Sequence, residues 1–144
     1  MCKNLFVIRF RMGAALCFAL AIGHLACLGF LWQIFDIYGI APQMHTLASL
    51  WQPLPYLITA GIALCFAIAG MYGLAYSGAV RRLPLQTWVV WFTCIVFLLR
   101  AVVGLVVLLS DFTLLELTST LGAALLGLCF FPCRCACPKD TPRA

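Results

Sequence analysis

The chain has 144 residues, of which 65 % are hydrophobic and only 9 % are charged, and its formal net charge is +5. Soluble domains carry about 25 % charged residues, so this composition excludes an ordinary soluble protein and indicates a membrane protein. The basic residues form no patch interleaved with aromatic side chains, which argues against nucleic-acid binding.

Four apolar stretches meet or approach the roughly 20 residues that a helix needs to cross a hydrocarbon core of about 30 Å. They predict transmembrane helices at residues 13–35, 56–77, 87–109 and 113–131. Lipid cannot hydrogen-bond to an open backbone, so each stretch must satisfy its own polar groups as a helix. We therefore predict an all-α protein, a four-helix transmembrane bundle within residues 1–132. The first stretch exceeds a signal-peptide core and is expected to remain as an anchor.

Charge placement predicts how these helices are threaded. Eight of the nine Lys and Arg residues fall on one side of the predicted membrane, namely Lys3, Arg9, Arg11, Arg81, Arg82, Arg134, Lys139 and Arg143. The opposite side carries Asp36, Asp111 and Glu116 and no basic residue. Because basic loops stay in the cytoplasm, both termini are predicted to be cytoplasmic.

Residues 36–55 form the one long loop on the predicted outer side. Pro42 suits the first turn of a helix, and apolar residues follow at helical spacing, namely Met44, Leu47, Leu50 and Trp51. This pattern predicts a short amphipathic helix at the outer interface. The segment would be either a simple link between two helices or a gate or partner contact.

Small residues recur at helical spacing within the stretches, including Ala19, Gly23, Cys27, Ala63, Ala67, Gly70, Gly122 and Gly127. Helices associate in lipid by close van der Waals approach, which small side chains allow. These positions predict tight helix packing.

Arg100 is the one basic residue inside an apolar stretch. It lies nine residues before Leu109, which places it about 13 Å below the predicted outer boundary at 1.5 Å per residue. An arginine near a helix centre costs roughly 2.5–3.5 kcal/mol on insertion scales, and its guanidinium stays protonated. It therefore needs an acceptor, and Thr93 and Gly104 on the same helical face leave room for one.

Four other residues are candidate partners of Arg100. His24 lies at nearly the same predicted depth, and Asp36 ends the first helix at the outer interface. Asp111 lies on the Arg100 face three turns higher, and Glu116 lies one turn into the fourth helix, within reach of an arginine that extends towards water. Three explanations stay open: an ion pair joining the third and fourth helices, a ligand site for an anion, lipid headgroup or quinone, or a contact to another subunit.

The C-terminal segment 133–144 is predicted to be a cysteine-rich cytoplasmic tail. Cys133, Cys135 and Cys137 alternate there, and closely spaced thiolates can bind Cu(I) or Zn. The alternating spacing differs from the two-residue gap between the cysteines of zinc knuckles. The alternatives to a metal site are a reduced, irregular tail and a tail whose cysteines carry a lipid. No glycine-rich phosphate loop, metalloprotease motif or nucleophile elbow is present, so no enzyme activity and no cofactor are predicted.

The motifs AIGHLACL, FDIYGIAP, GMYGLAYSGAVRRLPL and FLLRAVVGL make residues 21–105 similar to small bacterial inner-membrane proteins grouped with the DoxX-like proteins. The matching positions are His24, Tyr38, Gly39, Pro42, Gly73, Leu74, Arg82, Leu83, Pro84 and Arg100. Some members of that group are membrane subunits of quinone-linked redox complexes. The resemblance therefore implies a bacterial inner-membrane location and an accessory role, and it transfers no activity.

Two functions are consistent with these features. The first is a non-enzymatic integral inner-membrane protein, an accessory or structural subunit of a larger complex. Its partners would be the lipid bilayer and either other membrane subunits or further copies of itself. The second is a binding or transport module for an anionic lipid, a quinone or a small anion, with Arg100 as the key residue.

Overall fold

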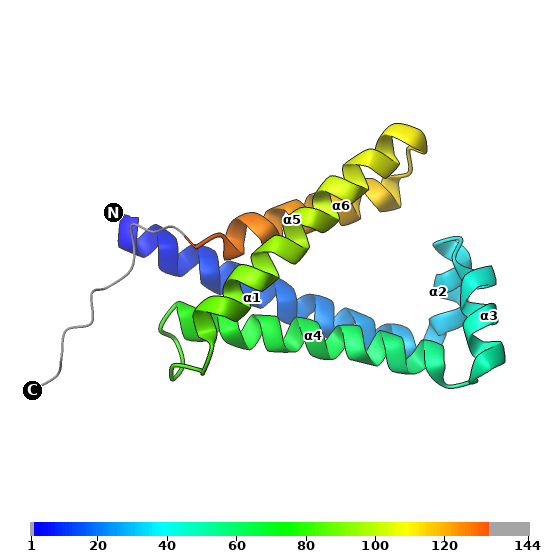
Figure 1. The fold of residues 1–144 in the computed structure, drawn as a ribbon, viewed down its shortest axis with the longest axis horizontal. Coiled ribbons are helices and arrows are strands. Elements are labelled where there is room, and N and C mark those ends of the chain that lie inside the picture. Colours follow the sequence, from blue (N-terminus) through cyan, green and yellow to red (C-terminus); the bar gives the residue numbers. More distant parts are fainter. Residues whose placement is uncertain (1, 133–144) are drawn as a thin grey trace, which may run out of the picture. The chain divides into compact units, whose positions relative to one another are not determined.

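The computed structural model describes residues 2–132, which contain helices and no strand (Figure 1). The elements are α1 (Cys2–Cys27), the 3-10 turn η1 (Leu28–Phe30), α2 (Leu31–Ile37), α3 (Ala41–Leu50), α4 (Leu54–Tyr76), α5 (Gln86–Ser110) and α6 (Leu114–Phe130). The chain divides into two compact units, one of residues 1–14 and 72–144 and the other of residues 15–71. The prediction of an all-α fold is confirmed in the described part of the chain.

The first unit is built on a hairpin of α5 and α6, which pack along their lengths (Figure 1). Gly127 of α6 makes this packing close, because a Cβ there would lie 2.7 Å from the Leu98 side chain of α5. The start of α1 and the end of α4 complete the unit around Phe130, which is fully buried. A Cβ on Gly73 of α4 would lie 3.0 Å from the Phe130 ring, and a Cβ on Gly13 of α1 would lie 2.9 Å from Cys129.

The second unit contains the end of α1, the short helices α2 and α3, and the start of α4. The α1 and α4 segments meet where the ring of His24 packs on that of Phe66, with 5.2 Å between ring centroids. Helices α2 and α3 form a small helical hairpin with its own core of Leu31, Phe35 and Ala41, against which Trp32 and Met44 pack. The short helix expected within residues 36–55 is therefore present as α3, with Pro42 in its first turn.

The predicted first helix, 13–35, has the wrong boundaries. Helix α1 begins at Cys2, because the lysine and arginines that precede the apolar run are good helix formers and hydropathy alone ignores them. It ends at Cys27, where a 3-10 turn containing Gly29 and a non-helical Phe30 (φ −130°, ψ 32°) separate it from α2. The other predicted helices differ from α4, α5 and α6 by one or two residues at each end.

Three helical stretches are long and apolar enough to cross a membrane: Asn4–Ile37, Leu54–Tyr76 and Gln86–Ser110. Helix α6 is apolar but has only 17 residues. At 1.5 Å per residue it extends about 26 Å, which is at the lower limit for a span. The structure thus supports a membrane protein.

The connection between α4 and α5 contains Arg81 and Arg82. Gly78 adopts a left-handed conformation (φ +77°) just after α4, and the backbone N–H of Ala79 donates to the Leu74 carbonyl. Glycine permits this conformation without a Cβ clash, so it ends the helix. The hydroxyl of Tyr72 donates to the Pro84 carbonyl at 3.2 Å, which ties the end of α4 to the same connection.

Candidate functional site

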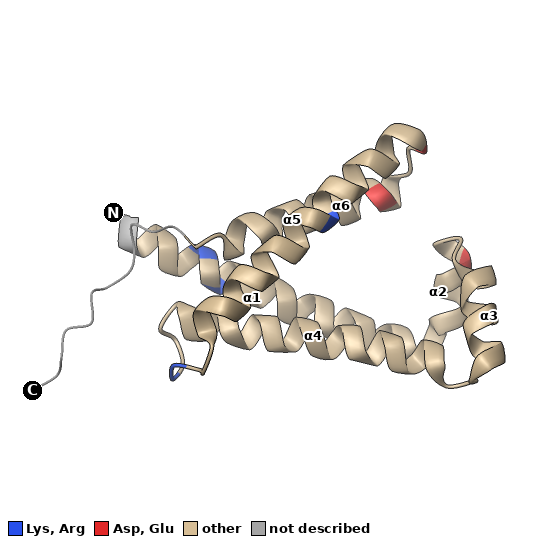
Figure 2. Ribbon diagram, viewed as in Figure 1, with Lys and Arg blue, Asp and Glu red and all other residues tan. Residues whose placement is uncertain are grey.

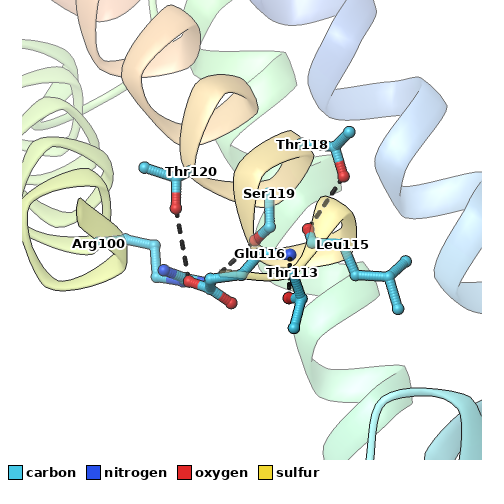
Figure 3. Close-up of polar contacts among 7 residues, drawn as sticks. All are labelled: Arg100, Thr113, Leu115, Glu116, Thr118, Ser119 and Thr120. Atoms are coloured by element: carbon cyan, nitrogen blue, oxygen red, sulfur yellow. Dashed lines mark hydrogen bonds and ion pairs between the residues drawn. The ribbon is translucent and has the colours of Figure 1, made fainter. Parts of the chain in front are cut away.

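Arg100 on α5 forms an ion pair with Glu116 on α6. Figure 2 shows how sparse charged residues are along the helices, and the pair joins a basic position on α5 to an acidic one on α6. The Arg100 Nη2 atom lies 2.9 Å from Glu116 Oε1 and donates to the Ser119 hydroxyl, also at 2.9 Å (Figure 3). Of the carboxylates expected as partners, the structure brings Glu116 to Arg100.

The start of α6 presents Glu116 and its polar neighbours towards α5. Ser119 and Thr120 follow Glu116 by three and four residues, which puts all three on one side of a helix. The Thr120 hydroxyl donates to Glu116 Oε1 at 3.4 Å (Figure 3). One carboxylate oxygen therefore accepts from both an arginine of α5 and a threonine of its own helix.

Thr113 determines where α6 begins. It is the N-cap residue, and its hydroxyl accepts the backbone N–H of Glu116 at 3.2 Å (Figure 3). In a full capping box the glutamate would bond back to the N-cap backbone. Here its carboxylate instead turns to Arg100, and the favourable position of an acidic residue in the first helical turn is kept.

Gly104 provides the space in which the two charges meet. A Cβ at this position would collide with Thr120 Oγ1, lie 2.6 Å from Arg100 Nη1 and lie 3.0 Å from Glu116 Oε1. Gly104 is buried and sits one turn along α5 from Arg100. The missing side chain at Gly104 thus leaves space for the guanidinium and the carboxylate between the backbones of α5 and α6.

The ion pair of Arg100 and Glu116 carries no net charge, which makes it compatible with apolar surroundings. Opposite charges in contact reduce the cost of placing either one in hydrocarbon. Within residues 2–132 the bonds of Arg100 all come from Nη2, so Nη1 and Nε retain open donors, and the side chain is 40 % exposed. The arrangement can join two helices, and it can also donate hydrogen bonds to a further acceptor.

The other predicted site residues lie apart from this pair. His24 belongs to the second unit, where its Nδ1 lies 2.8 Å from the Leu20 carbonyl and its ring packs on Phe66. Asp36 is exposed on α2 of the same unit, so any pairing of His24 or Asp36 with Arg100 stays a prediction. Asp111 is the exposed C-cap residue of α5, and its backbone N–H donates to the Val107 carbonyl.

A second arginine contact was not foreseen from the sequence. Arg9 of α1 donates from Nη2 to the carbonyl of Phe131, the C-cap residue of α6, and its guanidinium lies 5.7 Å from the centroid of the Phe10 ring. Cations are favoured at the negative end of a helix dipole. Charge placement alone assigns Arg9 to the cytoplasmic side, and the further signal in the sequence is Gly13, the close-packing glycine one turn along α1.

Three cysteines of the helices lie in packed surroundings, whereas Cys27 is half-buried and Cys65 is exposed. Cys17, Cys94 and Cys129 are buried, and the Cys94 thiol donates to the Gly127 carbonyl at 3.3 Å across α5 and α6. The predicted metal ligands Cys133, Cys135 and Cys137 lie outside the described residues. The metal prediction for the tail therefore stays a prediction.

Comparison with family models, with curated proteins and with solved structures finds no match to this chain. The interpretation of its function therefore rests on the helices and on the two arginine contacts.

Proposed function

We propose that the chain is a non-enzymatic integral inner-membrane protein that serves as an accessory or structural subunit of a larger membrane complex. The observation that carries this proposal is the use of Arg100, the charged residue of an apolar span, for an ion pair within its own chain. An arginine bound to a carboxylate and a hydroxyl of the neighbouring helix acts first as a packing element.

The proposal includes four membrane crossings with both termini in the cytoplasm. The positions of the basic residues support the orientation. Pairing supports the fourth crossing, because Arg100 can neutralise Glu116 when α6 enters the bilayer beside α5. The DoxX-like resemblance is consistent with an accessory role and stays a sequence-based prediction.

A role that depends on neighbours in the bilayer is supported by the large apolar side chains exposed along α5. They are Phe92, Ile95, Leu99, Val102, Val103 and Val106. Gly122 on α6 adds a small position with no other heavy atom of its unit within 4 Å of where a Cβ would lie. A second membrane protein could approach α6 closely there.

The test is native mass spectrometry of the tagged chain extracted from its own membranes in mild detergent. We expect a stoichiometric membrane partner. If the Gly122→Leu variant loses this partner but unfolds like the unaltered protein, the result would support contact through α6. Recovery of only a monomer or a homodimer, with and without prior crosslinking in the membrane, would contradict the proposal.

A second candidate function is a binding module for a ligand that reaches Arg100. It is favoured by the open Nη1 and Nε donors and by the 40 % exposure of the side chain. Since Glu116 already neutralises Arg100, a small anion would leave a net negative charge in the apolar region. A neutral acceptor, such as a quinone carbonyl or a lipid ester, is therefore favoured over an anion.

The double variant R100Q/E116Q separates the two candidates. It removes both charges together and keeps polar side chains of similar size, so the hairpin is expected to stay folded. Extraction of bound lipid and quinone from this variant and from the unaltered protein gives the readout. Loss of one bound species with retained fold would support the binding module, whereas retention of partner and lipids would support the structural role.

A further inference from the structure

The helical hairpin of α2 and α3 exposes apolar side chains outside its own core. They are Leu50 (77 %), Phe30 (67 %) and Trp51 (56 %) near its ends, and Ile37 (66 %) and Tyr38 (55 %) at its tip. The hairpin core of Leu31, Phe35 and Ala41 is already closed by Trp32 and Met44. The exposed groups are therefore surplus to the folding of the hairpin.

The connections of the hairpin restrict where it can lie. Counted from Met12, just after the basic residue Arg11, α1 extends about 24 Å to Cys27, and with the 3-10 turn that follows it approaches a hydrocarbon core of about 30 Å near Phe30. Helix α4, a candidate span, begins at Leu54, only three residues after Trp51. Phe30 and Trp51 thus stand at the entry and the exit of the hairpin, next to the ends of two apolar helices, and α2 turns away from the line of α1 (Figure 1).

Charge and polarity indicate the kind of surface that the hairpin meets. Residues 28–53 contain one acidic residue, Asp36, and no Lys or Arg. Gln43, Thr46 and Ser49 recur every three residues on α3 and are exposed, which gives that helix a polar side. An amphipathic hairpin with no basic residue and with exposed Tyr and Trp is suited to the headgroup region, where such rings have one apolar and one wet end.

We infer that the hairpin of α2 and α3 lies in the lipid interface on the side opposite the basic loops, with Phe30, Leu50 and Trp51 inserted. Its binding is driven by apolar burial and aromatic anchoring, so it is insensitive to anionic lipid. The inference rests on the proposed membrane insertion of the spans. The hairpin would fix the depth of the ends of α1 and α4, much as interfacial anchors fix helix tilt.

Trp32 is partly buried by packing within the hairpin, which provides an internal reference for the exposed Trp51. Trp32 stacks on His45 with 4.5 Å between ring centroids and an interplanar angle of 18°. It also packs edge-on against Phe35, at 5.8 Å. One tryptophan of the hairpin, Trp32, therefore packs on residues of the hairpin itself, and the other, Trp51, is available for the proposed lipid contact.

The test is quenching of tryptophan fluorescence by dibrominated phosphatidylcholine in reconstituted vesicles. The W88F/W91F protein retains Trp32 and Trp51, and the Trp32–His45 stack stays intact. The W51F/W88F/W91F protein retains Trp32 alone, so the difference between the two proteins gives the signal of Trp51. We expect bromolipid to lower the Trp51 signal at least about twofold and the Trp32 signal much less. Replacing a third of the lipid by phosphatidylglycerol should leave both values unchanged.

A protein that keeps only Trp88, on α5, controls for membrane insertion, because that side chain is 77 % exposed at the end of a candidate span. Quenching of Trp88 with no quenching of Trp51 would overturn the inference alone. If acrylamide then quenches Trp51, the side chain is in water. If neither bromolipid nor acrylamide quenches it, a partner or a second copy covers it. Absence of quenching at Trp88 would overturn the proposed membrane insertion as well. Quenching of Trp51 only with anionic lipid would overturn the proposed driving force.

Discussion

Arg100 and Arg9 bind the same helix, α6, at its opposite ends and by different means. Arg100 contacts the first turns through a carboxylate and a hydroxyl, whereas Arg9 contacts the C-cap residue through its backbone carbonyl and lies over a phenylalanine ring. The difference follows from position along the chain. A cation in the middle of an apolar helix needs an opposite charge, but one near a helix end can use the dipole of another helix and aromatic rings.

The contrast predicts that the Arg100 end is the more sensitive to loss of charge. Glu116→Gln should have the largest effect, because it leaves Arg100 uncompensated in an apolar helix, at a cost of roughly 2.5–3.5 kcal/mol. The free energy of unfolding, measured by titrating detergent micelles with SDS, reports the loss. In a double-mutant cycle, R100Q/E116Q should recover most of it. A double variant as unstable as the single one would contradict a specific ion pair.

Gly104→Ala should disturb the same end by geometry and without changing any charge. The new Cβ would lie 2.6 Å from Arg100 Nη1, so the pair must move apart, and overpacking of this kind costs about 1–3 kcal/mol. Gly122→Ala is the matched control on α6, since a Cβ there meets no atom within 4 Å. The SDS titration should shift for the first variant only, and equal shifts would show that the space at Gly104 has no special role.

Arg9→Gln should have a smaller effect at the other end of α6. It removes a charge-assisted hydrogen bond to the Phe131 carbonyl, and such bonds contribute about 1.5–3 kcal/mol, of which glutamine can keep part. Arg11→Gln is the control, because Arg11 is a neighbouring exposed cation on the same helix. Hydrogen exchange of the last turn of α6 should rise for Arg9→Gln and stay unchanged for Arg11→Gln. The same increase in both would indicate a general charge effect.

Thr113→Ala should have the smallest effect. It removes the acceptor for the Glu116 backbone N–H, and loss of an N-cap costs typically about 1 kcal/mol. Fraying of the first turn should also loosen the carboxylate, so mobility of the Arg100 guanidinium by NMR is the readout. Thr113→Ser, which keeps the hydroxyl, should behave like the unaltered protein. Equal mobility in all three proteins would mean that the cap does not position Glu116.

The apolar runs were sufficient to predict helices close to α4, α5 and α6, because each run is bounded by polar or helix-breaking residues. They failed at the first helix, where the amphiphilic start of α1 and the break at Gly29 are set by local propensity. The predicted depth of Arg100 in the membrane also did not select one partner among several candidates. The choice of Glu116 depends on the three-residue turn between α5 and α6 and on the space at Gly104, and both are properties of the pairing of two helices.

If α5 and α6 both cross the bilayer, as proposed, the order in which Arg100 and Glu116 are synthesised affects how the two helices are inserted. Glu116 follows Arg100 by sixteen residues, so α5 leaves the ribosome with its arginine before the neutralising carboxylate exists. Arg100 in α5 alone, or Glu116 in the short α6 alone, would face hydrocarbon as an isolated charge. Insertion of the two helices together avoids both costs. On the proposed four-crossing topology, the ion pair would therefore favour insertion of α5 and α6 as one unit during synthesis.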